Sequence, residues 1–321
     1  MMNLRDLSVS QHVGLLFVMI FGGLLLTTVI TVAKGFREMD PEKQSTYERF
    51  RLELRALWIS TALFWIAWAA GAFVATLLFA LTSFLAFREF ITLTHTRRGD
   101  HRALLAAFFV VLPLQYILVG TRHFDLFTVF IPVYAFAALP VLAALGNDHT
   151  RFLERTAKIQ WGTTVCVYGL SHVPALLLLN FGGDDNGAFL VLYIVLVVAG
   201  AQIAQELASR RMRRRPVARQ ISRSFSWRAW GVGIFAAGIV GVLMYWATPF
   251  KPLQALFIGC VAGGCGTLGE LVMKALKRDA GVRHWGGRSS VTGAVGLLDR
   301  VAPLCFAAPV FFHSVRWYFG V

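Results

Sequence analysis

Charged residues with the chemistry to bind phosphate or a metal ion are concentrated near the C-terminal end of the sequence. Glu270, Lys274 and Lys277 are separated by four and three residues, so a helix places them on one face. Further charges follow at residues 277–279 and, after a glycine-rich stretch, at residues 299–300. Carboxylates beside cationic side chains could hold a divalent cation such as Mg²⁺ over a phosphate. The alternative is that these charges extend from helix ends to the membrane surface.

A second concentration of charge lies between two apolar blocks. Its arginines are Arg210, Arg211, Arg213, Arg214, Arg215, Arg219, Arg223 and Arg228. Clusters of four to eight basic residues beside a membrane span attract anionic lipid head groups, at about 1 kcal/mol per charge. The cluster therefore predicts a site for an anionic lipid. Two alternatives are an orientation signal alone and a protein or nucleotide partner.

Long apolar blocks must position these groups. The chain of 321 residues is 57% hydrophobic and 15% charged, whereas soluble domains carry about 25% charged residues. A helix that crosses a bilayer needs about 20 mostly apolar residues. The sequence predicts an all-α polytopic transmembrane bundle of about ten spans, at residues 13–33, 56–71, 73–94, 103–121, 125–146, 159–179, 187–207, 230–248, 252–273 and 298–319.

The distribution of basic residues predicts the orientation. Connections that follow odd-numbered spans hold 27 of the 31 lysines and arginines. Because Lys and Arg accumulate in cytoplasmic loops, we expect the large basic loops in the cytoplasm and both termini outside. The net charge of +14 thus reflects membrane orientation, and we expect no nucleic-acid partner.

The four cysteines, Cys166, Cys260, Cys265 and Cys305, all lie inside apolar blocks, and none forms a CxxC pair. We expect them to pack between helices as small apolar side chains rather than to form disulfides.

Several segments resemble a known enzyme family. Residues 277–282 (KRDAGV), the glycine-rich stretch after them, residues 298–300 (LDR) and residues 306–312 (FAAPVFF) resemble the C-terminal signature of phosphatidate cytidylyltransferases, also called CDP-diacylglycerol synthases. Residues 83–90 (SFLAFREF) resemble an early segment of the same family. The resemblance implies a membrane enzyme that joins CTP and phosphatidate into CDP-diacylglycerol, releasing pyrophosphate with the help of metal ions.

The resemblance also implies roles for individual residues. For an active protein it implies catalysis and Mg²⁺ binding by Asp299, Asp279 and Glu270. It implies substrate phosphate binding by Lys277, Arg278, Arg300 and Arg283. The basic cluster, which departs from the family pattern, predicts lipid head-group binding by Arg213, Arg214, Arg215, Arg219, Arg223 and Arg228.

The sequence departs from the family pattern where that pattern carries charge. Phe225 and Arg228 stand where the family has lysine and glutamate, and Gln202 and Ala302 stand where it has aspartates. Arg283-His284 replaces a Lys-Asp pair. Removing one charge-stabilising group commonly slows a reaction by about a hundred- to a thousandfold. We therefore expect a degenerate relative with weak or no cytidylyl transfer and a lipid-binding or regulatory role. The alternative is an active Mg²⁺-dependent cytidylyltransferase with a reduced acidic site.

We expect three regions: an N-terminal span with a charged cytoplasmic loop (1–55), a membrane bundle (56–200) and a cytidylyltransferase-like region (201–321) with a basic loop at 208–229. The expected location is the bacterial inner membrane, with the site facing the cytoplasm. The expected partners are anionic membrane lipids, CTP and an enzyme of phospholipid synthesis.

Overall fold

The computed structural model describes residues 9–35, 41–94, 96–181, 187–212, 217–222, 225–282 and 296–320, and every regular element within them is helical. The longer α-helices are α1 (Val9–Gly35), α2 (Pro41–Ala70), α3 (Ala72–Thr92), α10 (Gly187–Met212), α11 (Trp227–Leu243), α12 (Pro252–Asp279) and α13 (Leu297–Phe319). The shorter α-helices are α4 (His101–Ala106), α5 (Leu112–Gly120), α6 (Phe124–Val129), α7 (Phe136–Ala144), α8 (Phe152–Gly162) and α9 (Leu170–Leu177). Two 3₁₀ turns, η2 (Arg98–Asp100) and η6 (Tyr245–Ala247), and three π-helical segments, η3 (Ala107–Val111), η4 (Phe130–Ala135) and η5 (Thr163–Gly169), complete the set.

The π-helical segments join short α-helices into continuous rods, namely α4–η3–α5, α6–η4–α7 and α8–η5–α9. Each predicted span falls largely on one long helix or one rod, although several of these helices extend beyond the predicted ends. Seven helices in the described part of the chain are long and apolar enough to cross a membrane, and α11 is a shorter apolar helix. The all-α polytopic membrane architecture is therefore confirmed. The number of spans and the side on which the termini lie remain predictions.

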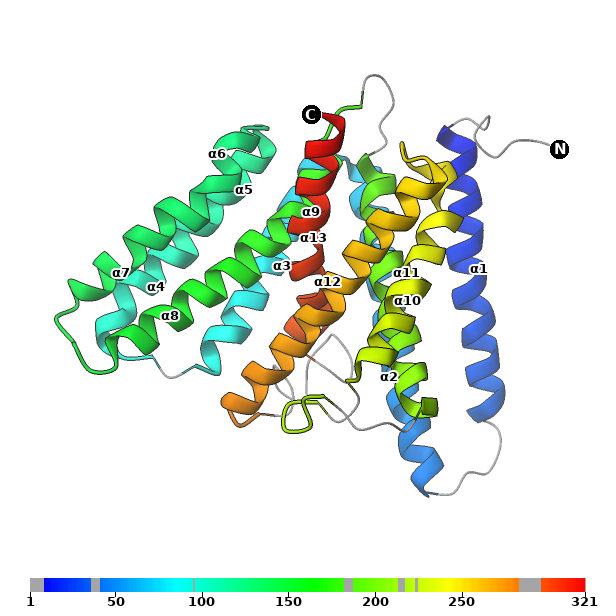
Figure 1. The fold of residues 1–321 in the computed structure, drawn as a ribbon, viewed down its shortest axis with the longest axis horizontal. Coiled ribbons are helices and arrows are strands. Elements are labelled where there is room, and N and C mark those ends of the chain that lie inside the picture. The colour runs from blue at the N-terminus through cyan, green and yellow to red at the C-terminus, as the bar shows by residue number, and fades with distance from the viewer. Residues whose placement is uncertain are drawn as a thin grey trace.

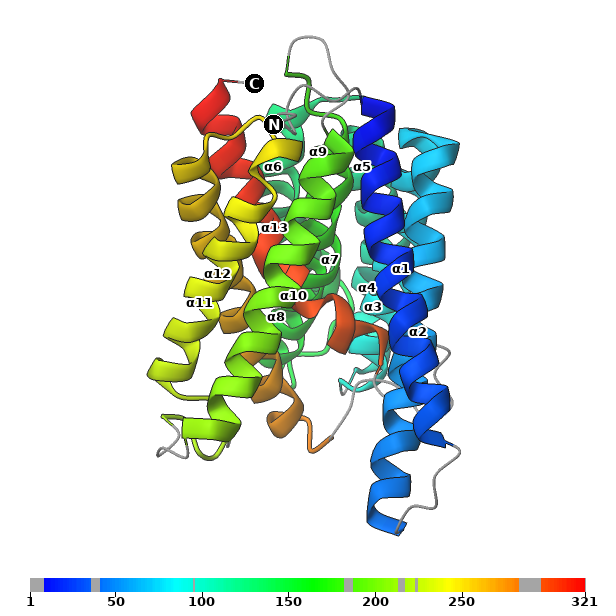
Figure 2. The ribbon, with the colours of Figure 1, turned by 90° about the vertical axis from the view of Figure 1, so that its right-hand side faces the viewer.

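The helices form three groups along the molecule (Figure 1). Helices α10 to α13 pack against one another in the middle, α1 and α2 lie on one side, and the rods from α4 to α9 lie on the other. Helix α3 joins the groups, since it contacts α2, α5, α9 and α13. The beginning of α1 and the end of α13 lie at the same end of the bundle (Figure 2).

Three helices continue past their apolar blocks. Helix α2 begins at Pro41, α10 ends at Met212 and α12 ends at Asp279. Residues 41–55 and 208–212, which the sequence assigned to loops, are therefore helical. These extensions are rich in Glu, Lys, Arg and Gln, which favour helix as strongly as most apolar residues do. Apolarity predicts where a membrane span ends, but it does not predict where the helix ends.

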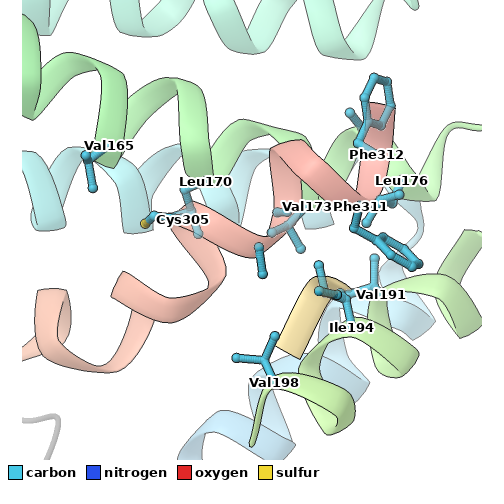
Figure 3. Packing of buried hydrophobic residues seen from close by; sticks show 14 of the residues in the cluster. Val165, Leu170, Val173, Leu176, Val191, Ile194, Val198, Cys305, Phe311 and Phe312 are labelled. Atoms are coloured by element: carbon cyan, nitrogen blue, oxygen red, sulfur yellow. The ribbon is translucent and has the colours of Figure 1, made fainter. Parts of the chain in front are cut away.

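The core lies where α9, α10 and α13 meet (Figure 3). Val173 of α9, Ile194 of α10 and Phe311 of α13 are all buried there. Cys166 and Cys305 are also buried, and all four cysteines are free, as the sequence predicted. Helix α13 thus contributes both to the core and, through Asp299 in its first turn, to the charged region that the sequence predicted.

Glycine allows η5 and α13 to touch through their backbones. A Cβ atom added to Gly169 would lie 2.4 Å from the carbonyl oxygen of Cys305, which is closer than real Cβ contacts allow. Small residues commonly permit such close approach between membrane helices.

Replacing Gly169 by alanine should therefore destabilise the protein by about 1–3 kcal/mol, the usual cost of forcing extra volume into a packed core. Gly14→Ala is the matched control, because nothing lies within 4 Å of a Cβ atom at Gly14. Thermal denaturation in detergent should show a lower midpoint for the first variant alone. Equal midpoints for the two variants would contradict the close packing of η5 on α13.

Candidate functional site

Helix α12 places Glu270, Lys274 and Lys277 on one face, as their spacing predicted. The Nζ atom of Lys274 lies 2.6 Å from Oε1 of Glu270. Gln202 of α10 donates a hydrogen bond from Nε2 to Oε2 of Glu270, with a length of 3.0 Å. Both oxygens of the Glu270 carboxylate are therefore engaged by the chain itself.

The first turn of α13 lies against three other helices. Asp299 forms an ion pair with Lys277 of α12, and both side chains are largely buried, at 12% and 14% exposure. Arg300 forms an ion pair with Glu53 of α2, with 2.6 Å between a guanidinium nitrogen and Oε2. The backbone N–H of Leu298 donates a hydrogen bond of 2.6 Å to Oε2 of Glu89, on α3.

These contacts bring five helices together at one site. We call the eight side chains the charged cluster: Glu53, Glu89, Gln202, Glu270, Lys274, Lys277, Asp299 and Arg300. The cluster holds four carboxylates and three cations, so its charges nearly balance. Ion pairs that are partly buried are screened by salt much less than surface pairs. Salt at physiological ionic strength should therefore weaken the ion pairs of the charged cluster only slightly.

The sequence identified part of this cluster. Glu270, Asp299 and Arg300 were predicted as site residues. The structure places them where the C-terminal part of α12 lies beside the first turn of α13. Glu53 and Glu89 were missed. Glu89 is the only acidic residue in the SFLAFREF segment on which the resemblance partly rests, and that was an available signal. Glu53 lies in a predicted loop among basic residues, and nothing in the sequence singles it out.

The predicted set of three magnesium ligands is not assembled in this structure. Glu270 and Asp279 are nine residues apart on α12, which corresponds to about 13 Å along the helix axis. Mg²⁺ needs ligand oxygens at about 2.0–2.1 Å, so these two carboxylates cannot share one ion. Among the described residues, no group of three or more His, Cys, Asp or Glu side chains could hold a metal ion. Residues 283–295, which lie outside the described residues, contain no carboxylate.

Phe225 is the aromatic residue that the sequence resemblance aligns with a lysine of the family pattern. Phe225 is buried, at 3% exposure, and its ring lies 5.7 Å from that of Trp227. Its carbonyl oxygen accepts a hydrogen bond from the N–H of Val217. Ser226 follows as the N-cap of α11 and accepts a hydrogen bond from the N–H of Ala229. At Phe225 and Ser226, the loop before α11 is therefore anchored by apolar packing and a helix cap.

The remaining predicted basic residues are on the surface or outside the described residues. Arg219, Arg228 and Arg278 are exposed, and so is Asp279. Arg210, at the end of α10, is exposed and pairs with Glu206 at 2.5 Å. The predicted site residues that lie outside the described residues are Arg213, Arg214, Arg215, Arg223 and Arg283.

Comparisons with known proteins point in the same direction as the sequence motifs. The model of the cytidylyltransferase family matches residues 51–318. The chain is 34% identical over 304 residues to the uncharacterized protein YnbB of Escherichia coli (strain K12), covering 93% of this chain and 96% of that protein. It is 35% identical over 88 residues to the phosphatidate cytidylyltransferase of Synechocystis sp., covering 27% of this chain and 29% of that protein.

Proposed function

Since the chain belongs to the cytidylyltransferase family, we propose that it keeps the family's membrane fold and binds an anionic phospholipid, with little or no cytidylyl transfer. Phosphatidate is the first candidate, because a relative of matching sequence is named for its action on that lipid. The proposed role is regulation of phospholipid synthesis at the cytoplasmic face of a bacterial inner membrane, in contact with an enzyme of that synthesis.

One observation carries this proposal. Lysines of α12 already pair with both Glu270 and Asp299, two of the three carboxylates to which the family resemblance assigns metal binding. Transfer of a nucleotidyl group depends on metal ions that bridge phosphate oxygens and neutralise developing charge. Carboxylates that are paired with lysine bind such ions weakly unless the lysines move away. A phosphate monoester, in contrast, could bind to the same lysines directly.

The buried Phe225 supports the same proposal. A lysine at this position would add a positive charge that stabilises the transferred phosphoryl group. A buried phenyl ring cannot do so, and its apolar packing favours a loop that holds its shape without substrate. The exposed arginines at the ends of α10 and α11 would meanwhile attract an anionic membrane surface.

An active enzyme is the second candidate, and Glu89 favours it. The Glu89 carboxylate lies within electrostatic range of Asp299, so the cluster holds more negative charge than the sequence suggested. If substrate drew Lys277 away, these two carboxylates could accept a cation together. Turnover measurements distinguish this candidate from the first.

The binding proposal is tested by thermal stability of the purified full-length protein. We expect phosphatidate at 100 times its dissociation constant to stabilise the protein by about 2.7 kcal/mol. Phosphatidylcholine and CTP with Mg²⁺ should have no comparable effect. Lys277→Gln should abolish most of the increment that phosphatidate adds, whatever it does to stability without ligand.

Arg316→Gln is the matched control, because Arg316 lies near the opposite end of α13 and pairs with the exposed Asp125. It should leave the phosphatidate increment unchanged. Equal stabilisation by phosphatidylcholine, or stabilisation by CTP with Mg²⁺ alone, would count against the proposed lipid-binding role.

A further inference from the structure

The first turn of α13 has no local N-cap. The residue at this position is Gly296, which has no side chain to accept a hydrogen bond. The first N–H groups of any helix need an acceptor from elsewhere, and a buried helix end without one is costly. Leu298 is fully buried, so water does not supply this acceptor. Glu89 supplies it from α3, 209 residues away in sequence.

Three successive residues of this turn are held by three different helices. The N–H of Leu298 is bound to Glu89 of α3, Asp299 to Lys277 of α12, and Arg300 to Glu53 of α2. Side chains of consecutive helical residues diverge by about 100° around the axis. The contacts of Asp299 and Arg300 therefore fix the rotation of the turn, while the hydrogen bond to Glu89 fixes its position along the axis.

The helix itself holds this turn less firmly than usual. Pro303 lies inside α13 and has no N–H to donate to the carbonyl of Asp299, four residues earlier. A second proline, Pro309, lies two turns further on. The turn that carries Asp299 and Arg300 thus depends on contacts from other helices for its orientation.

We propose that Glu89 and Glu53 are positioning residues of the phosphate-binding site. They act through the first turn of α13, which sets where Lys277, Asp299 and Arg300 lie relative to one another. This inference rests on the proposed binding of a lipid phosphate at the charged cluster. It assigns a role in the C-terminal site to α2 and α3, which lie more than 200 residues earlier in the sequence.

The test compares Glu89→Ala with Glu89→Gln in the full-length protein. The amide oxygen of glutamine still accepts a hydrogen bond from Leu298, whereas alanine accepts none. We expect Glu89→Ala to weaken binding to phosphatidate-containing vesicles by about tenfold, the effect of losing one strong hydrogen bond. Glu89→Gln should recover most of that loss. Glu53→Gln, which keeps its size but loses its charge, should weaken binding by a smaller factor.

Glu206→Gln is the matched control, because Glu206 is 63% exposed and forms its ion pair within α10, with Arg210. It should bind vesicles as the unchanged protein does. Hydrogen exchange of residues 297–301 gives an independent readout of the turn. Exchange there should quicken about tenfold in Glu89→Ala, much less in Glu89→Gln, and not at all in Glu206→Gln.

The two readouts separate the inference from the proposed function. If the unchanged protein bound phosphatidate and Glu89→Ala bound it equally well, the positioning role would be overturned while the function stood. If the unchanged protein showed no preference for phosphatidate over phosphatidylcholine, the function would fail. Faster exchange in Glu89→Ala would then still support the control of α13 by α3. Unaltered exchange would overturn that control.

Discussion

Replacing Arg155 by alanine is expected to lower the free energy of unfolding by about 3–5 kcal/mol, the usual effect of removing one partner from a buried ion pair. Arg155 is 5% exposed, and its Nε atom lies 3.4 Å from Oδ1 of Asp100, which is 1% exposed. A guanidinium nitrogen also lies 2.6 Å from Oδ2 of Asp148. Removal of the guanidinium would leave the Asp100 charge buried without its partner.

This ion pair joins two connections of the bundle. Asp100 ends the 3₁₀ turn before α4, and Asp148 lies between α7 and α8. The backbones touch nearby, since a Cβ atom on Gly146 would lie 2.2 Å from the carbonyl oxygen of Gly99. A hydrogen bond from the N–H of Thr150 and the contact with Arg155 lower the pKa of Asp148 to about 2. Asp148 therefore stays charged, and its share of the stability is lost only as the pH falls below about 4 toward that value.

The control for Arg155→Ala is Lys158→Ala, one turn further along α8. Lys158 pairs with Glu154 at 2.6 Å, but Glu154 is 48% exposed. Exposed pairs four residues apart contribute about 0.3–0.5 kcal/mol, so we expect little change. Thermal or denaturant unfolding in detergent provides the measurement. Similar losses from the two substitutions would show that Arg155 is not a buried structural charge.

The sequence predicted those parts of the structure that depend on local pattern. Apolar block length located the helices, and a spacing of four and three residues put Glu270, Lys274 and Lys277 on one face. That all four cysteines are free, two of them buried and two partly exposed, is also consistent with their apolar surroundings in the sequence. These predictions succeeded because each depends on residues that are close in sequence.

The missing parts depend on contacts between distant segments. Glu89 meets α13 across 209 residues, and Glu53 meets Arg300 across 247 residues. No periodicity or charge pattern within one helix specifies such pairs. The hydrogen bond from Gln202 to Glu270 could not be predicted either. In the sequence, glutamine in place of a family aspartate indicates only that a charged group is missing. In the folded protein the amide occupies one carboxylate oxygen and helps to fix its position.

The second large effect concerns catalysis. We expect the protein to make CDP-diacylglycerol at least about a thousandfold more slowly than an efficient family member, since each missing charge-stabilising group commonly costs a hundred- to a thousandfold. In the proposed alignment Phe225 stands where the family has one such group, and the lysines beside Glu270 and Asp299 would oppose cation binding. Losses from groups that act as a unit are not additive in free energy, so the factors for the individual groups cannot simply be multiplied.

A gain-of-function series tests the physical cause of this deficit. Lys274→Gln frees the Glu270 carboxylate from its ion pair while Lys277 stays in place to bind phosphate, and Phe225→Lys restores a cation to the loop before α11. If ion pairing and the lost lysine limit the rate, the double variant should turn over faster than either single variant. A double variant as slow as the unchanged protein would indicate that other groups limit the rate.

Formation of CDP-diacylglycerol from labelled CTP, phosphatidate and Mg²⁺ tests most directly whether the protein carries out cytidylyl transfer. The purified full-length protein is compared with Asp299→Asn and with the phosphatidate cytidylyltransferase of Synechocystis sp. as a positive control. We expect product at or near background for this protein, with no further loss in Asp299→Asn. Turnover close to that of the positive control, abolished by Asp299→Asn, would contradict this expectation.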